Sequence, residues 1–391
     1  MIQIKYFNLV LSVTVCLVAF SCQAKKTENQ AIITGAEQIH QYLPKLKDRS
    51  VALLVNHTSL IGEVHLLDTL LSRGVNVVKI FAPEHGFRGN LANGEQVLDA
   101  HDAKTGLPLV SLYGKNKKPS PEQLEGVDIV VYDIQDVGAR FYTYISSMHY
   151  MMAACAENNT AFLLLDRPNP NAHYIDGPVL EEAYASFVGV HPIPIVYGMS
   201  TGELATMIKG EGWINQADQL DLSVVELKNW KHSSIFDLPI SPSPNLPNGQ
   251  SIALYPSLCL FEGTDISMGR GTDFPFQAVG YPDPAYGDFQ FTPRSIEGVS
   301  KYPPHKNKIC YGNDLRSINP PNRIDLAYLI QYYQLSKNKS EYFNAFFTNL
   351  SGTRKLRKQI EEGWSEGEIR ASWQEDLNKF KAKRQQYLIY E

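Results

Sequence analysis

Short apolar runs alternate with stretches of helical spacing along the chain from Ser50 onward. Runs that are apolar at nearly every position are typical of strands covered on both faces, and an apolar residue every three or four positions is typical of a helix. Alternation of the two predicts an α/β fold around a mainly parallel sheet. Ser200 precedes Glu203 by three positions, which predicts a capping box at the start of one helix. The strands are expected at residues 51–55, 75–81, 107–112, 127–132, 161–165 and 193–196, and the helices at 65–73, 141–157 and 201–211.

A change in composition marks the end of this pattern. Residues 241–250, SPSPNLPNGQ, combine three prolines with two asparagines and a glycine. Residues of this kind form turns and interrupt helices and strands, so we expect a domain boundary just before them, near residue 235. The chain beyond is rich in proline, glycine and aromatic residues up to about residue 321 and has helical spacing after that. We therefore predict a first domain over 31–235 and a smaller α+β domain over 236–391.

The N-terminus has the pattern of an export signal. Lys5 precedes an uninterrupted run of apolar and small residues, 9–20, that ends at Ser21 and Cys22. This run is too short to span a membrane comfortably and is typical of a signal peptide. A small residue directly before Cys22 resembles the lipobox of bacterial lipoproteins, which implies a lipid anchor at Cys22 and a polar tether up to residue 30. An ordinary secretory signal with an incidental cysteine is the alternative, and both interpretations export the protein, the first to the periplasmic face of a bacterial membrane.

Composition and missing motifs narrow the class of function. The formal charge is −5, from 41 acidic and 36 basic side chains, and no basic block interrupts the chain, so the sequence does not predict a nucleic-acid partner. Cys155, Cys259 and Cys310 lack the spacing of a metal site or a disulfide framework. No dinucleotide-binding, P-loop, nucleophile-elbow, zinc-protease or EF-hand motif is present. The sequence thus predicts neither a cofactor nor a metal, and the chemistry that remains is acid/base catalysis by carboxylates.

Polar loops follow four of the expected strands. They are NHTS (56–59), APEHGFRG (82–89), DIQDVGARFY (133–142) and DRPNPN (166–171). Ligands of α/β sheets bind beyond the carboxyl ends of the strands, so side chains of these loops are expected to gather at one edge of the sheet. The candidates are Asn56, Glu84, His85, Arg88, Asp133, Asp136, Arg140, Asp166 and Arg167.

Glu84 is the strongest of these candidates. Pro83 before it and Gly86 after it predict a stiff, tight turn that aims one carboxyl group into a cleft. The alternative is a surface glutamate at the start of a helix. His85 is either a proton carrier or substrate ligand, or a structural histidine beside the turn.

The aspartates of the later loops allow two interpretations. Asp133 or Asp136 could supply a second catalytic carboxylate. Alternatively, Asp136 caps the following helix and Asp133 pairs with a buried arginine such as Arg140. We interpret Asp166 and Arg167 as a self-paired, structural loop.

The second domain contributes a dense polar and aromatic segment between residues 241 and 277. Aromatic faces beside amide and carboxylate groups suit a sugar, whose ring has apolar faces and a hydroxyl edge. Glycoside hydrolysis needs a carboxylic acid for the leaving oxygen and a second carboxylate or a substrate group for the cation-like transition state. A turn-rich domain interface is the alternative. The polar candidates in this segment are Asn245, Tyr255, Glu262, Arg270, Asp273 and Gln277.

These segments, in this order, resemble the NamZ-like exo-β-N-acetylmuramidases, a family long catalogued as a domain of unknown function. The resemblance covers nearly all of the chain after the signal peptide. It implies a Rossmann-like N-terminal domain, a smaller C-terminal domain, a cleft between them, and removal of single N-acetylmuramic acid residues from the non-reducing ends of peptidoglycan fragments. It also implies that Glu84, in the PEHG motif, is the catalytic acid. The matching strings are LLVNHTSL, FAPEHGFRG, VYDIQDVGARFYTYI, LLDRPNPN, PIVYGMSTGELA, SPSPNLPN and YPSLCLFEGTDISMGRGTDFPFQ.

The implied substrate sharpens the site prediction. N-acetylmuramic acid carries a lactyl carboxylate, which an arginine matches with two hydrogen bonds, so Arg88, Arg140 and Arg270 are candidate ligands. We hypothesise that Glu84 protonates the glycosidic oxygen while Asp136 or Glu262 assists water or orients the acetamido group. The competing functions are an esterase or amidase of wall peptides and a non-catalytic lipoprotein that binds glycan or a transported solute. Further substrate-binding candidates are Asn56, His85, Asp133, Asn245 and Gln277.

Overall fold

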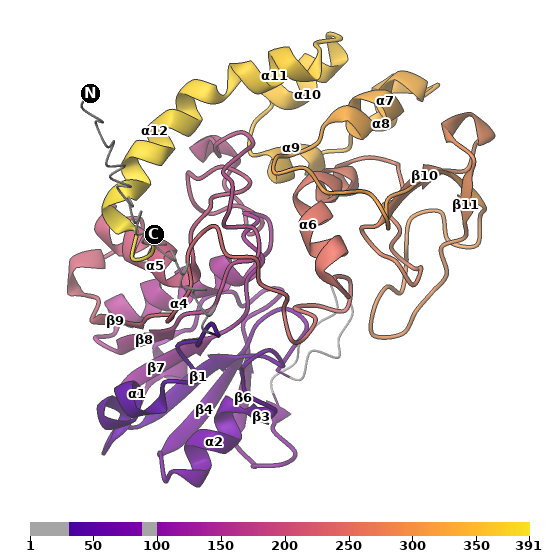
Figure 1. The fold of residues 1–391 in the computed structure, drawn as a ribbon. Coiled ribbons are helices and arrows are strands. Elements are labelled where there is room, and N and C mark those ends of the chain that lie inside the picture. The colour runs from indigo at the N-terminus through magenta and orange to yellow at the C-terminus, as the bar shows by residue number, and fades with distance from the viewer. Residues whose placement is uncertain (1–30, 88–99) are drawn as a thin grey trace, which may run out of the picture. The chain divides into compact units, whose positions relative to one another are not determined.

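A seven-stranded sheet organises the first part of the chain in the computed structural model, which describes residues 31–87 and 100–391 (Figure 1). The strand order is β5-β6-β4-β1-β7-β8-β9; β5 runs antiparallel to its neighbour and the other pairs are parallel. This confirms the predicted α/β fold with a mainly parallel sheet. The strands are β1 (Val51–Val55), β4 (Val77–Ala82), β5 (Ala100–His101), β6 (Pro108–Ser111), β7 (Ile129–Asp133), β8 (Ala161–Leu165) and β9 (Leu222–Val225), and β2 (Leu60–Ile61) pairs with β3 (Val64–His65) in a separate hairpin.

Helices cover both faces of this sheet, which explains the apolar runs (Figure 1). All five residues of β1 are buried. Successive side chains of a strand point to opposite faces, so Leu53 packs with α1 and α2 while Leu54 packs with α4 and α5. The capping box of Ser200 and Glu203 is confirmed. The helices of this part are α1 (Ile39–Leu46), α2 (Leu66–Ser72), α3 (Pro121–Leu124), α4 (Tyr144–Glu157) and α5 (Thr201–Gly210), with 3-10 turns η1 (Glu182–Tyr184) and η2 (Ala217–Gln219).

One expected strand is wrong. Residues 193–196 are buried and apolar but form only isolated bridges, in which Val196 pairs with Ala139 and Asp176. Two main-chain carbonyls of this segment, those of Ile193 and Ile195, instead accept hydrogen bonds from the side chain and the main-chain amide of Arg140. The edge strand β9 was not expected, because its residues are mostly half-buried and lack a continuous apolar run.

The second part of the chain has a small sheet and many helices. Its three strands are antiparallel in the order β10-β12-β11. The expected α+β character and the helical C-terminus are confirmed, while the boundary near residue 235 stays a prediction. The elements are α6 (Gly249–Leu258), η3 (Cys259–Gly263), β10 (Ala278–Tyr281), η4 (Pro284–Tyr286), β11 (Phe289–Phe291), β12 (Cys310–Asp314), α7 (Ala327–Leu335), α8 (Lys339–Tyr342), α9 (Phe346–Ser351), α10 (Lys355–Glu361), α11 (Glu366–Ser372), α12 (Gln374–Arg384) and η5 (Gln385–Tyr387).

Some predictions fall on residues that the structure does not describe. The signal peptide, the tether, Cys22 and Arg88 lie outside the described residues. Within the described ranges, none of the helices has the length and hydrophobicity needed to cross a membrane.

Candidate active site

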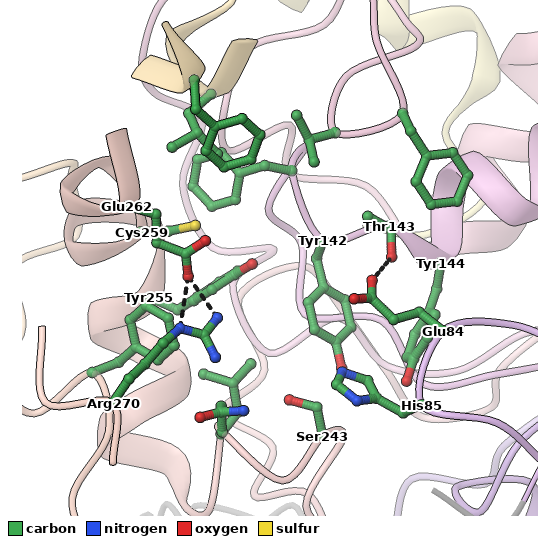
Figure 2. Close-up of a pocket in the computed structure, with 18 of the residues that line it drawn as sticks. Glu84, His85, Tyr142, Thr143, Tyr144, Ser243, Tyr255, Cys259, Glu262 and Arg270 are labelled. Carbon is green, nitrogen blue, oxygen red and sulfur yellow. Dashed lines mark hydrogen bonds and ion pairs between the residues drawn. The ribbon is translucent and has the colours of Figure 1, made fainter. Parts of the chain in front are cut away.

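A pocket opens where the loops after the sheet's strands face the segment around α6 and η3 (Figure 2). Glu84 and His85 enter it from the loop after β4, and Tyr142 from the segment before α4. Glu262 and Arg270 stand on the facing wall, as Figure 2 shows. The pocket thus combines candidates from both parts of the chain, as the sequence predicts.

A tight turn directs Glu84 into this pocket. The Gly86 amide donates to the Pro83 carbonyl at 3.0 Å, and His85 adopts a φ of 67°. Few residues other than glycine take a positive φ, so the turn holds His85 in an uncommon conformation beside the site. Glu84 as a whole residue is only 8% exposed, and its Oε2 accepts a hydrogen bond from the Thr143 hydroxyl at 2.7 Å. The predicted stiff turn is confirmed, and the carboxyl group it carries has a fixed position.

Two tyrosines adjoin Glu84 that the sequence interpretation missed. Burial raises the pKa of Tyr113, and the charge of Glu84 and a hydrogen bond to it raise that pKa further. Burial also raises the pKa of Tyr144, with the Glu84 charge as the next cause. Both phenols therefore stay protonated at neutral pH. Tyr113 follows the expected strand at 107–112, so its position after a strand was a usable signal.

The facing wall carries a buried ion pair. Arg270 Nε and Nη2 donate to Glu262 Oε1 at 2.9 and 2.5 Å, and its guanidinium lies 4.9 Å from the centre of the Phe276 ring. Burial lowers the pKa of Arg270, but the charge and hydrogen bonds of Glu262 outweigh burial and raise it. Arg270 Nη1 is buried and has no hydrogen-bond partner among the described residues. One guanidinium nitrogen therefore remains available to an anionic ligand.

Asp133 and Arg167 form a buried, structural ion pair outside the pocket lining. Arg167 Nε and Nη2 donate to the two carboxylate oxygens of Asp133 at 2.5 and 3.0 Å, and both side chains are buried. The expectation that Asp133 pairs with a buried arginine is confirmed, but the partner is Arg167 and not Arg140. The Arg167 main-chain amide donates to Asp166 Oδ1 at 3.0 Å, while the Arg167 guanidinium binds Asp133 and not Asp166. Asp166 accepts from Ser200 at 2.6 Å and from the Gly202 amide at 2.9 Å, so it anchors the start of α5.

Arg140 is also structural. Its side chain is fully buried, and it donates to four main-chain carbonyls between 2.7 and 3.0 Å. It does not line the pocket, so the structure gives no support to its predicted role as a ligand of the lactyl group. The four acceptors are the carbonyls of Pro178, Ile193, Leu350 and Ser351.

Asp136 lies in the protein interior and not on the pocket. Its Oδ2 accepts from the Gly138 amide at 2.6 Å and the Tyr197 hydroxyl at 2.5 Å, while Oδ1 has no partner within residues 31–87 and 100–391. Burial raises the pKa of Asp136 to about 6. It does not cap α4, which begins eight positions later at Tyr144. Neither the catalytic nor the capping interpretation of Asp136 has structural support.

The remaining candidates divide between the pocket and its surroundings. Asn245 lines the pocket, and its Nδ2 donates to the Val299 carbonyl at 2.9 Å. Asn56 is buried and accepts from the Thr58 amide, so it shapes its own turn. Gln277 is buried and accepts from Asn248 at 3.2 Å, and Asp273 is an exposed partner of Arg294. None of these last three lines the pocket, whereas Tyr255 does.

Comparison with known families gives matches along most of the chain. A family model described as the N-terminal part of the exo-beta-N-acetylmuramidase NamZ matches residues 51–250, and a model of its C-terminal part matches 253–390. The chain is 39% identical over 392 residues to the peptidoglycan beta-N-acetylmuramidase NamZ of Bacillus subtilis (strain 168), which covers 94% of this chain and 92% of that relative.

Two crystal structures of DUF1343 family proteins from Bacteroides fragilis NCTC 9343 have similar folds. The first is 48% identical with a TM-score of 0.85, and the second is 30% identical with a TM-score of 0.81. Each match covers 92% of this chain and 99% of the other. The architecture described above is therefore shared over nearly the whole length of these proteins.

Proposed function

Because the chain belongs to the NamZ family of exo-β-N-acetylmuramidases, we propose that it is a glycoside hydrolase that releases N-acetylmuramic acid from the non-reducing ends of peptidoglycan fragments. The observation that carries this proposal is Glu84, which a rigid turn and Thr143 hold in a pocket opposite the Arg270 guanidinium. An enzyme that cleaves an acidic sugar requires a carboxylic acid to protonate the leaving oxygen and a cationic group to bind the carboxylate of the sugar, and these two groups stand on facing walls of the pocket.

Glu84 acts as the proton donor in this proposal. Its Oε2 accepts a hydrogen bond from the Thr143 hydroxyl, which holds the carboxyl group in the pocket, where its proton passes to the glycosidic oxygen. Protonation of that oxygen lets the bond to the anomeric carbon break, and the departing sugar leaves as an alcohol. A water molecule forms the new bond to the anomeric carbon and loses a proton, which releases free N-acetylmuramic acid. The neutral hydroxyl of Tyr113 hydrogen-bonds to the same carboxyl group and helps to position it.

Arg270 binds the lactyl carboxylate of the substrate. Among the three arginines that the sequence suggests, Arg140 is fully engaged by carbonyls and Arg88 lies outside the described residues. Arg270 lines the pocket with its Nη1 unpaired in the described structure. Its other nitrogens are held by Glu262, so we assign Glu262 to orienting this guanidinium and not to attack on the sugar.

The proposed location follows from the N-terminal sequence. A signal peptide cleaved directly before Cys22 would place the protein as a lipoprotein on the periplasmic face of a bacterial membrane, beside its substrate. Labelling of the full-length protein with a fatty-acid analogue, and its loss in Cys22→Ser, would support lipidation.

The activity can be tested directly with two model glycosides. Purified protein is incubated with chromogenic β-glycosides of N-acetylmuramic acid and of N-acetylglucosamine, which differ only in the lactyl group. We expect release of free muramic acid and much slower turnover of the lactyl-free compound. Absence of hydrolysis of both compounds and of muropeptides would instead favour a glycan-binding lipoprotein.

A further inference from the structure

An apolar rim surrounds the charged walls of the pocket. Phe187 and Val188 contribute to it from the loop after η1, and Phe346 and Leu350 contribute from α9. Phe346 and Leu350 are four positions apart, so they lie one above the other on the same face of the helix. The Phe346 residue is 36% exposed although it lines the pocket, which places it where the pocket meets solvent. Leu350 is buried, so this face of α9 runs inward from the rim.

Hydrogen bonds from Arg140 connect the two segments that form this rim, the loop after η1 and α9. Nη1 donates to carbonyls at both ends of the segment 178–193, which carries Phe187, and Nη2 donates to Leu350 and Ser351 at the end of α9. The Glu181 amide adds a hydrogen bond to the Gly352 carbonyl at 2.9 Å. The apolar rim is therefore held by buried polar contacts between segments far apart in the sequence.

Packing contacts support the two aromatic residues of the rim, Phe187 and Phe346. Phe187 stacks on Tyr150 with 6.2 Å between ring centres and 16° between planes, and the Lys117 ammonium lies 4.7 Å from its centre. On α9, Phe347 is buried against Phe343 at 4.3 Å, which fixes the start of the helix that presents Phe346. Single exposed hydrophobic residues are common on proteins. Phe346 differs because it stands on the rim of the pocket that holds the proposed acid.

We infer that this rim, with Phe346 as its platform, binds the sugar ring on the leaving side of the scissile bond. The inference rests on the proposed function: when the terminal muramic acid lies between Glu84 and Arg270, the sugar bonded to it must lie at the mouth of the pocket. Sugar rings present apolar C–H faces that pack on aromatic rings. Phe346 is accordingly a specificity residue for the N-acetylated sugar that remains on the fragment, and it does not contact the released residue.

A comparison of two ligands tests this assignment. The substrate is the disaccharide of N-acetylmuramic acid β-linked to N-acetylglucosamine, and the competitive inhibitor is free N-acetylmuramic acid, which reaches only the inner pocket. We expect Phe346→Ala to raise the KM for the disaccharide about tenfold and to leave the inhibition constant of the free sugar within about twofold. Phe346→Tyr keeps an aromatic face and should retain a KM close to that of the parent protein.

Trp364→Ala is the matched control, because Trp364 is 38% exposed and does not line the pocket. An unchanged disaccharide KM in Phe346→Ala, or an equal weakening of both ligands, would overturn the assignment. Failure of the proposed function gives a different result, since the parent protein would then not hydrolyse the disaccharide. Thermal unfolding of each variant confirms that the fold is intact.

Discussion

Carboxylates stand at the carboxyl ends of three strands of the sheet, β4, β7 and β8, yet they have two different environments. Glu84, after β4, stands in the pocket and receives its hydrogen bonds from hydroxyl groups. Asp133, at the end of β7, and Asp166, after β8, are completely buried and bind an arginine or the start of a helix. The difference teaches that a position at the carboxyl edge of a sheet only offers a side chain to a site. Whether that side chain takes part in catalysis depends on which hydrogen bonds and ion pairs it already forms within the protein.

Asp133→Asn should have the largest effect on stability in this comparison. Removal of one partner leaves the Arg167 guanidinium buried without its counter-ion, which typically costs about 3–5 kcal/mol. Urea unfolding measures the loss, with Asp218→Asn on the exposed surface as the control. A loss below about 1 kcal/mol would mean that Asp133 is not the structural residue described here.

Asp136→Asn should change how stability depends on pH. Burial raises the pKa of Asp136 from 3.8 to about 6, so the folded state binds its proton more tightly than the unfolded state. The resulting stabilisation is complete below pH ~3.8 and is lost as the pH rises through about 6. The difference between a pKa of 3.8 and one of about 6 corresponds to roughly 3 kcal/mol of stability. The variant should therefore lose less stability than the parent between pH 4 and 7 in urea titrations, and parallel curves for the two proteins would contradict this account.

Arg270→Ala should reduce substrate preference while leaving the acid in place. A hydrogen bond to a charged group contributes about 1.5–3 kcal/mol, so the preference for the muramic acid glycoside over its lactyl-free analogue should fall roughly 10- to 100-fold. Arg294→Ala, an exposed arginine that does not line the pocket, is the control. If the ratio of kcat/KM values for the two glycosides stays constant, Arg270 does not bind the lactyl group.

The sequence predicts the sheet and the Glu84 turn because local features determine both. Apolar runs at 51–55 and 161–165 coincide with β1 and β8, and proline and glycine around Glu84 produce the turn. The partner of a buried charge cannot be predicted in this way, because the Asp133–Arg167 ion pair depends on how two loops meet in space. Arg140 and its four carbonyls could not be predicted for the same reason.

The residues that form the rim of the pocket could not be predicted from the sequence. Phe346 belongs to a C-terminal region with few chemical signals, and α9 reaches the pocket through its packing against η3 and its contacts with Arg140. Tyr113 is the exception among the missed residues, because it follows an expected strand and could have been included.

The central claim is that Glu84 protonates the departing sugar, and its isosteric substitution tests this directly. Release of muramic acid from the chromogenic glycoside is measured for the parent, for Glu84→Gln, and for Glu182→Gln, which changes an exposed glutamate outside the pocket. General-acid catalysis contributes about 10²–10⁴-fold, so Glu84→Gln should lose that factor with an unchanged unfolding midpoint, while Glu182→Gln should behave as the parent. Near-parent turnover by Glu84→Gln would contradict the assignment of the acid.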